Sequence, residues 1–204
     1  MNHGSKACAL VLAVLCCTTL LTGCKKQNVM TEDELPYGAT MRSTSAYAVP
    51  LTYDRRFLEE PQVETIASFL GALENSDGTV LEQTTFPEYF AYELGEVYAE
   101  NCKNADEVAA AKHDALAETY GNGGQLHFKE VELTGLTQEQ QQSGIAALLT
   151  MLYQLSDDEH LAEKIDNTWC VTMDWTVEGA ESTELVQERT LYLLEEDGVY
   201  YCIM

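Results

Sequence analysis

Apolar residues recur three and four positions apart between about residues 61 and 120, which predicts amphipathic helices. The first helix begins at Pro61, because proline suits a first helical turn, and it ends at the turn sequence NSDG. The second covers about residues 87–100 and has an aromatic-rich face. The third begins at Asn104, which is spaced to form a capping box with Glu107, and ends at GNGG.

Two other segments have the period of a β-strand. In residues 125–133 the apolar side chains change phase between Phe128 and Val131, so a β-bulge near Lys129 and Glu130 would place them all on one face. Upstream, the sequence AYAVPLTYD alternates with period two. Its proline limits that segment to an edge strand or an extended segment docked on the domain.

Another helix is predicted after Gly135. Thr137 and Gln140 resemble a capping box, and a short helical piece, DEHLAEKI, follows this helix. The apolar stripe of the helix consists of Ile145, Leu148, Leu149, Leu152 and Leu155.

The C-terminal part contains three strand-like segments, TWCVTMDWTV, TELVQERTLYLL and VYYCIM, joined by the turn sequences EGAES and EEDG. The order of elements predicts an α+β fold. N-terminal helices would pack on a curved antiparallel sheet that ends in a three-stranded meander. We expect one domain over residues 46–204 and find no internal repeat.

The N-terminal apolar run, residues 7–21, follows Lys6 and is shorter than the roughly twenty residues of a transmembrane helix. It ends in LTGC, which resembles the lipobox of bacterial lipoproteins. The resemblance implies cleavage before Cys24 and a diacylglycerol on its thiol, with residues 1–23 as the signal peptide and 24–45 as a tether. The alternatives are an ordinary signal peptide and a short transmembrane anchor.

The formal net charge is −23, with an isoelectric point near 4.2. Such a surface repels nucleic acid, so we expect no nucleic-acid partner. The acidic residues are scattered in short groups, which favours a solvated surface over a dedicated cation site.

Three cysteines lie outside the signal and anchor, namely Cys102, Cys170 and Cys202, and they are widely spaced. Neither they nor the scattered histidines His113, His127 and His160 form a zinc or redox motif. In a simple meander Cys170 and Cys202 would be about 9 to 10 Å apart, too far for a disulfide. Both should be free thiols unless Cys102 meets one of them.

From residue 61 onward, the element order and the closing sequence DGVYYCIM resemble the nuclear transport factor 2 superfamily, to which ketosteroid isomerase belongs. The resemblance implies a cone-shaped domain, and a cystatin-like helix on a sheet is the nearest alternative. In enzymes of that superfamily the interior of the cone carries an acid or histidine base. Here Asp174 has the opposite phase to Trp175 and the other apolar residues of its strand, so we assign no catalytic residue.

The next strand leaves one interior site open. Gln187 and Arg189 share the phase of its leucines, and Tyr200 or Tyr201 of the last strand could lie beside them. A buried arginine beside a tyrosine could hold a carboxylate. The alternative is an exposed Arg189 paired with a neighbouring glutamate.

Two classes of function fit the sequence. The first is a lipid-anchored binding or accessory module on the extracytoplasmic face of the cell membrane. It would be held by the lipid on Cys24 and would bind an envelope protein or a small ligand. The second is a small-molecule enzyme of the isomerase or dehydratase type that uses the cone pocket. We find no sequence motif for a cofactor or a metal.

Overall fold

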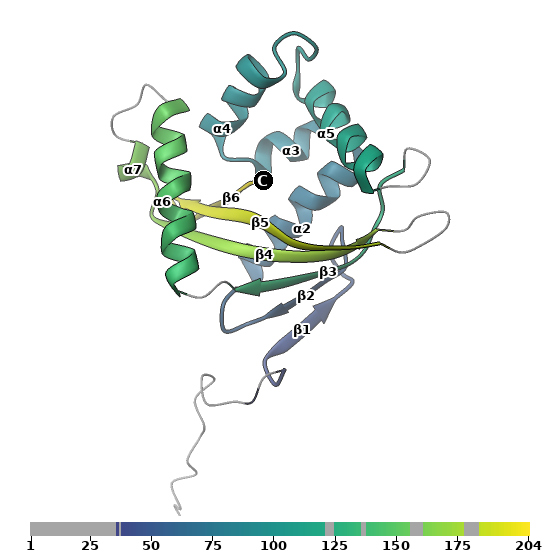
Figure 1. The fold of residues 1–204 in the computed structure, drawn as a ribbon, viewed down its shortest axis with the longest axis vertical. Helices are drawn as coiled ribbons and strands as arrows, with labels where there is room; N and C mark the ends of the chain where they lie inside the picture. The colour runs from purple at the N-terminus through teal and green to yellow at the C-terminus, as the bar shows by residue number, and fades with distance from the viewer. Residues whose placement is uncertain (1–35, 37, 121–124, 136–137, 156–160, 178–183) are drawn as a thin grey trace, which may run out of the picture. The chain divides into compact units, whose positions relative to one another are not determined.

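The computed structural model describes residues 36, 38–120, 125–135, 138–155, 161–177 and 184–204 (Figure 1). The chain divides into two units, Met1–Pro36 and Tyr37–Met204, and all the elements below belong to the second unit. The lipobox with Cys24, the capping residue Thr137, His160 and the turn EGAES lie outside the described residues.

A six-stranded sheet has its strands in chain order, and neighbouring strands are antiparallel except β2 and β3, which are parallel. With helices packed against it, the sheet makes the fold α+β, and β4, β5 and β6 form the predicted C-terminal meander. The strands are β1 (Met41–Thr44), β2 (Leu51–Asp54), β3 (Phe128–Gly135), β4 (Asn167–Val177), β5 (Glu184–Glu196) and β6 (Val199–Ile203).

The helices fall into two chain segments. Because parallel strands cannot be joined by a tight turn, the connection from β2 to β3 is long, and it contains most of the helices. These are α2 (Glu60–Asn75), α3 (Gly78–Thr84), α4 (Pro87–Tyr92), the π-helix η2 (Glu93–Val97) and α5 (Ala105–Tyr120). Between β3 and β4 lie α6 (Gln138–Leu155) and α7 (Leu161–Lys164).

The larger apolar core lies between the sheet and the helices α2, α3 and α5 (Figure 1). Trp175 of β4 lies at the centre of this core and is 1% exposed. The rings of Tyr120 and Phe128 meet the Trp175 ring edge to face, with centroids 6.1 and 5.5 Å away. The predicted phase of β4 is confirmed, because Val171, Met173 and Val177 are buried as Trp175 is, whereas Asp174 is half-buried on the other face.

A second, smaller core lies on the opposite face of the sheet. There Leu148 and Leu152 of α6 pack with Leu194 and Ile203. Along their strands, Leu194 and Ile203 alternate with residues whose side chains face the larger core. Gly144 allows this approach, since a Cβ atom there would lie 3.0 Å from the sulfur of Cys170. Cys170 is therefore buried although it has the same phase as Asp174.

Several local predictions are confirmed. Asn104 caps α5, because its Oδ1 accepts the backbone N–H of Glu107 at 3.0 Å. The reciprocal bond differs slightly, since Glu107 accepts from the N–H of Lys103. The register of β3 shifts between Phe128 and Glu130, as the predicted bulge requires. The turn EEDG joins β5 to β6, with positive φ angles of 51° and 76° at Asp197 and Gly198.

The predicted helix over residues 87–100 is not one α-helix. It consists of α4 followed by the five-residue π-helix η2. An additional helix, α3, follows α2 where the sequence NSDG predicted only a stop. Ser76 ends α2 with a left-handed conformation, φ 55°, and Asp77 caps α3 by accepting the N–H of Val80 at 3.0 Å.

The sheet also differs from expectation at its N-terminal edge. β1 lies in the stretch predicted as part of the tether, and it pairs with β2. β2 is therefore an interior strand, and the prediction of an edge or docked segment for it is wrong. Pro50 is compatible with this position because it immediately precedes the strand, where its carbonyl accepts the N–H of Val131 at 3.1 Å.

Replacing Trp175 with alanine should destabilise the domain by roughly 3 to 5 kcal/mol, because it removes a fully buried ring. Val199→Ala is the control: Val199 is also in a strand but is 49% exposed, and its truncation should change stability by less than about 0.5 kcal/mol. Denaturant unfolding measures both. Equal effects of the two substitutions would contradict the assignment of the core.

Candidate functional site

The described side chains of Arg189, Tyr200 and Tyr201 do not form the predicted interior site. Arg189 is exposed, and its guanidinium lies over the Tyr120 ring, 5.2 Å from the centroid, and donates a hydrogen bond to the Tyr120 hydroxyl. Arg189 therefore does not form the buried pair with Tyr200 or Tyr201 that the first interpretation requires; it is exposed, as in the alternative, and its described partner is a tyrosine of α5. Tyr200 stacks edge to face on Trp169, whereas Tyr201 belongs to the smaller core. The side chain of Gln187 lies outside the described residues.

The described histidines and cysteines make structural contacts. Nδ1 of His113 lies 3.0 Å from the Leu73 carbonyl oxygen, and Nδ1 of His127 lies 3.0 Å from Oε1 of Glu74. Cys102, Cys170 and Cys202 are buried free thiols, and burial raises the pKa of the last two. Within the part of the chain that the structure describes, no group of three His, Cys, Asp or Glu residues is placed to hold a metal.

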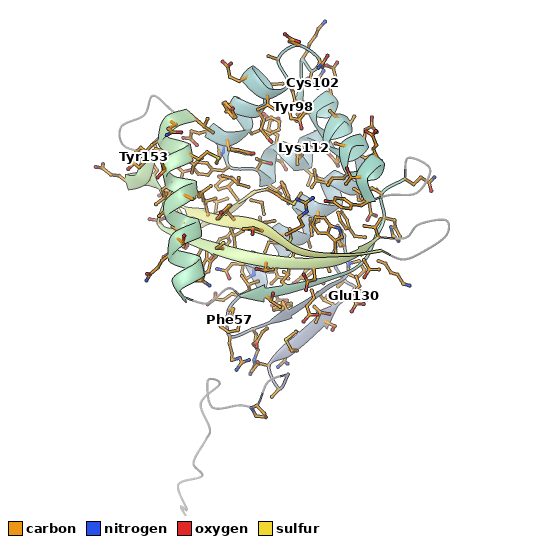
Figure 2. All side chains as sticks on the ribbon, in the orientation of Figure 1. Phe57, Tyr98, Cys102, Lys112, Glu130 and Tyr153 are labelled. Carbon is orange, nitrogen blue, oxygen red and sulfur yellow. The ribbon has the colours of Figure 1, made fainter. Side chains whose placement is uncertain are left out.

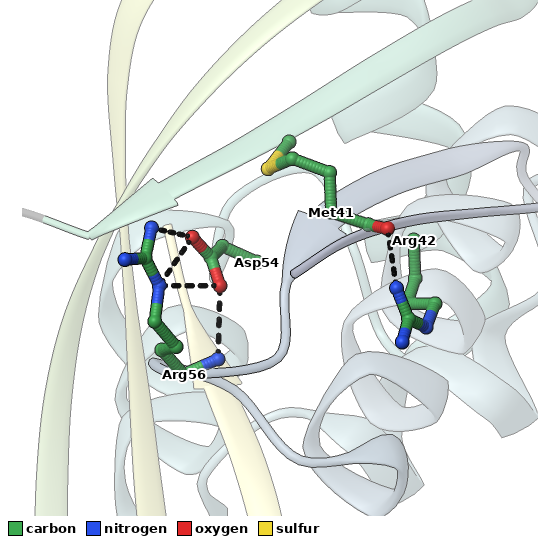
Figure 3. A network of polar contacts seen from close by, with 4 residues as sticks. All are labelled: Met41, Arg42, Asp54 and Arg56. Atoms are coloured by element: carbon green, nitrogen blue, oxygen red, sulfur yellow. Dashed lines mark hydrogen bonds and ion pairs between the residues drawn. The ribbon is translucent and has the colours of Figure 1, made fainter. Parts of the chain in front are cut away.

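One of the two buried acids in the described part, Asp54, closes a turn (Figure 3). Its carboxylate accepts hydrogen bonds from Nε of Arg56 at 2.9 and 3.1 Å and from the Arg56 backbone N–H at 3.0 Å. The hydrogen bonds from the Arg56 side chain lower the pKa of Asp54 to about 2. This pair fixes the chain between β2 and α2 and leaves no oxygen for a ligand.

The other buried acid, Glu93, is the stronger candidate for a functional group. It begins the π-helix η2 and is 4% exposed. Nζ of Lys112, from α5, lies 2.5 Å from Oε1 of Glu93, while Oε2 is buried with no hydrogen-bond partner among the described residues. Lys112 also lies 6.0 Å from the centre of the Tyr89 ring. The three successive helices α4, η2 and α5 thus bring together the phenol of Tyr89, the carboxyl group of Glu93 and the amine of Lys112.

Burial is the dominant electrostatic effect at this cluster. It raises the pKa of Glu93, whereas the charge of Lys112 and the Tyr89 hydroxyl act in the opposite direction. Burial and the nearby Glu93 carboxylate also raise the pKa of Tyr89. Tyr98 faces the same carboxylate, and burial and Glu93 raise its pKa as well. A carboxyl group that keeps its proton more readily than usual is suited to general acid or base chemistry.

The sequence does not reveal this cluster, because the spacing of the aromatic and apolar residues in 87–100 predicts one regular α-helix. The sequence does place Tyr89 and Glu93 four residues apart, but it gives no sign that a wider π turn follows. Such turns are rare and are often found at functional sites. Figure 2 shows Lys112, Tyr98 and Cys102 together in the helical layer, away from the sheet.

The described grooves lie elsewhere. One of about 320 Å³ runs beside β1 and β2 and includes Lys129 and Glu130. Another of about 380 Å³ lies between α2, the end of α3 and the start of β6, and is lined by Glu64, Gln83 and Tyr200 among others. Neither of these two grooves is lined by Glu93 or Lys112.

Comparison with known proteins adds no family. No family model, no curated protein and no solved structure matches this chain. Among the described residues, no helix has the length and apolar character needed to cross a membrane.

Glu93→Gln should change the pH dependence of stability in a defined direction. Because the folded state holds the Glu93 proton more tightly than the unfolded chain does, the wild type should gain stability relative to Glu93→Gln as the pH falls from neutral towards 4.5, the ordinary pKa of this side chain. Unfolding by denaturant at several pH values measures this difference.

Asp54→Asn is the matched control for that experiment. The pKa of Asp54 is lowered, so its contribution is present above 3.8 and is lost only as the pH falls from there towards 2. A wild type that loses stability relative to Glu93→Gln between neutral pH and 4.5 would show that the ion pair with Lys112 outweighs the cost of burial.

Proposed function

We propose that this protein is a lipid-anchored binding or accessory module on the extracytoplasmic face of a bacterial cell membrane. The observation that carries the proposal is the sequence LTGC at the end of a short apolar run, with Cys24 as the lipid attachment site. Two acyl chains on that cysteine give stable membrane attachment. The resemblance to the nuclear transport factor 2 superfamily is part of the same proposal, because many of its members are binding platforms.

The packing of the sheet supports a module rather than an enzyme of the cone-pocket type. The helix-facing side chains of the meander, such as Met173, Trp175 and Leu191, are apolar and at most 1% exposed. Asp174 faces away from them. At these positions the described meander presents buried apolar side chains to the helices, where an enzyme of that type would need an acid.

An isomerase or dehydratase is the second candidate, and the Glu93 cluster is the observation in its favour. A buried carboxyl of raised pKa beside an amine and a phenol provides the acid, the base and the hydrogen-bond donor that proton transfer next to a carbonyl requires. In this case the chemistry would take place between η2 and α5 and not on the sheet.

The anchor is tested by Cys24→Ser. Cells that express the wild type and are grown with a radioactive fatty acid should yield a labelled protein of mature size in the membrane fraction. The Cys24→Ser protein should be unlabelled and unprocessed. Cys17→Ser, at a neighbouring signal cysteine, is the control and should behave as the wild type. A Cys24→Ser protein that is still labelled would contradict the proposal.

The enzyme alternative is tested with a β,γ-unsaturated ketone, whose isomerisation to the conjugated ketone is followed by ultraviolet absorbance. If Glu93 is the base, Glu93→Gln should lower the rate by about 100-fold or more, and Asp54→Asn should not. A rate that is equal in wild type and Glu93→Gln would rule out this role for Glu93 in the reaction.

A further inference from the structure

The last strand of the described sheet, β6, leaves part of its outer edge open. It pairs with β5 through a hairpin whose closing pair is Glu196 and Val199. In a two-residue hairpin the closing pair is hydrogen-bonded, and pairs without hydrogen bonds then alternate with bonded ones along the strands. The main-chain N–H and C=O groups of Tyr200 and Cys202 therefore point away from β5.

A neighbouring segment covers Cys202 but not Tyr200 in the described part of the chain. The Cys202 carbonyl accepts the N–H of Phe86 at 3.2 Å, which agrees with the direction inferred from the hairpin. Thr85 forms an isolated parallel bridge with Cys202. Among the described residues no such bridge is found at Tyr200, so its main-chain donor and acceptor are open to a further strand.

The groove of about 380 Å³ described above lies beside this open position. It is lined from α2, from the end of α3 and from the start of β6. Pro61 and the 49% exposed Val199 supply apolar surface, whereas Glu64 and Gln83 supply a carboxylate and an amide. An extended segment paired with Tyr200 would place every second side chain on the α2 side of the sheet, where this groove lies.

The chain around the groove carries charge of one sign. From residue 57 to residue 101, a stretch that includes α2 and α3, the sequence has ten acidic residues and no lysine, arginine or histidine. Residues 199–204 have no charged side chain. Burial raises the pKa of Tyr200, and the nearby carboxylates of Glu195 and Glu59 raise it further. The electrostatic potential at this edge is therefore negative.

The described bases nearest in sequence do not offset this charge in the groove. Arg55 and Arg56 precede α2, but neither lines the groove, and Arg56 is paired with Asp54. Lys164 of α7 lies 3.5 Å from Oε1 of Glu88, in an ion pair. Among the described lining residues Glu64 is the charged one, and it is exposed. The groove thus favours a basic segment and disfavours a second copy of this acidic chain.

We propose that the open edge of β6 and the groove beside it bind an extended, basic segment of a partner protein. The main chain of that segment would pair with Tyr200, and one of its lysine or arginine side chains would reach Glu64. In this mode of recognition the main-chain hydrogen bonds supply affinity and the side-chain contacts supply specificity. The inference rests on the proposed binding role and names its surface and partner chemistry, but it does not require the lipid on Cys24.

The test measures binding of a fluorescein-labelled heptapeptide of alternating lysine and threonine to the full-length protein in a non-ionic detergent. Fluorescence anisotropy should show saturable binding, whereas a peptide with glutamate in place of lysine should not bind. Two further peptides are methylated on alternate main-chain nitrogens. Because an added strand uses every second N–H, one of these two should bind about tenfold more weakly than the other. Equal affinities would overturn the strand pairing.

Two variants with the same change of charge locate the site. Glu64→Lys should raise the Kd of the lysine peptide by about tenfold, and Glu64→Gln should raise it less. Glu118→Lys, at an exposed position of α5 that does not line the groove, should raise it by less than about twofold. Equal effects of the two lysine substitutions would show that only net charge attracts the peptide, and would overturn the site.

Hydrogen exchange provides a second measure of location. The Tyr200 amide should exchange more slowly when the lysine peptide is bound, whereas the Val199 amide, which faces β5, should change little. A wild type that binds none of the peptides overturns this docking surface. The anchor is judged separately by fatty-acid labelling of Cys24, because peptide binding in detergent is measured whether or not the lipid is present.

Discussion

The alternation of apolar side chains on β4 is the constraint on which both layers of this protein depend. One face of the strand presents Val171, Met173 and Trp175 to the helices that join β2 to β3. The other face is apolar only where α6 covers it, at Cys170. A shift of one residue in the register of β4 would expose Val171, Met173 and Trp175 and bury Asp174. The positions of the two helical layers are therefore coupled, because both depend on the register of this one strand.

The electrostatics of the two buried acids show how differently a protein can hold a carboxylate. Asp54 has its charge satisfied by a guanidinium in the same turn, and its pKa is lowered. In Glu93, one carboxylate oxygen is paired with Lys112, and the other has no hydrogen-bond partner among the described residues. The pKa of Glu93 is raised. A buried ion pair that is only partly satisfied is a poor source of stability. Holding Glu93 in this position therefore costs stability.

The elements whose signals are local could be predicted from the sequence, and those that depend on distant partners could not. Asn104 and Glu107 identify the start of α5, and the phase change after Phe128 identifies the bulge, because both involve residues within a few positions. By contrast, nothing near Met41 indicates a strand, since β1 exists only because β2 offers it an edge. The Glu93–Lys112 pair could not be predicted either, because it also depends on a distant partner. It forms only when α5 packs beside the π-helix η2, and no local sequence signal indicates that π-helix.

The parallel pairing of β2 with β3 has a consequence for how the chain folds. Leu51 pairs with Val131, although the whole of the larger helical layer lies between them in sequence. Closing so long a loop is slow, and it gains contacts only after the helices have formed. Gly71 of α2 also packs so tightly on Ala48 that a Cβ atom there would lie 2.6 Å from the Ala48 side chain. The N-terminal hairpin is therefore expected to join a nearly complete core as the last step of folding, and to leave it first when the domain opens.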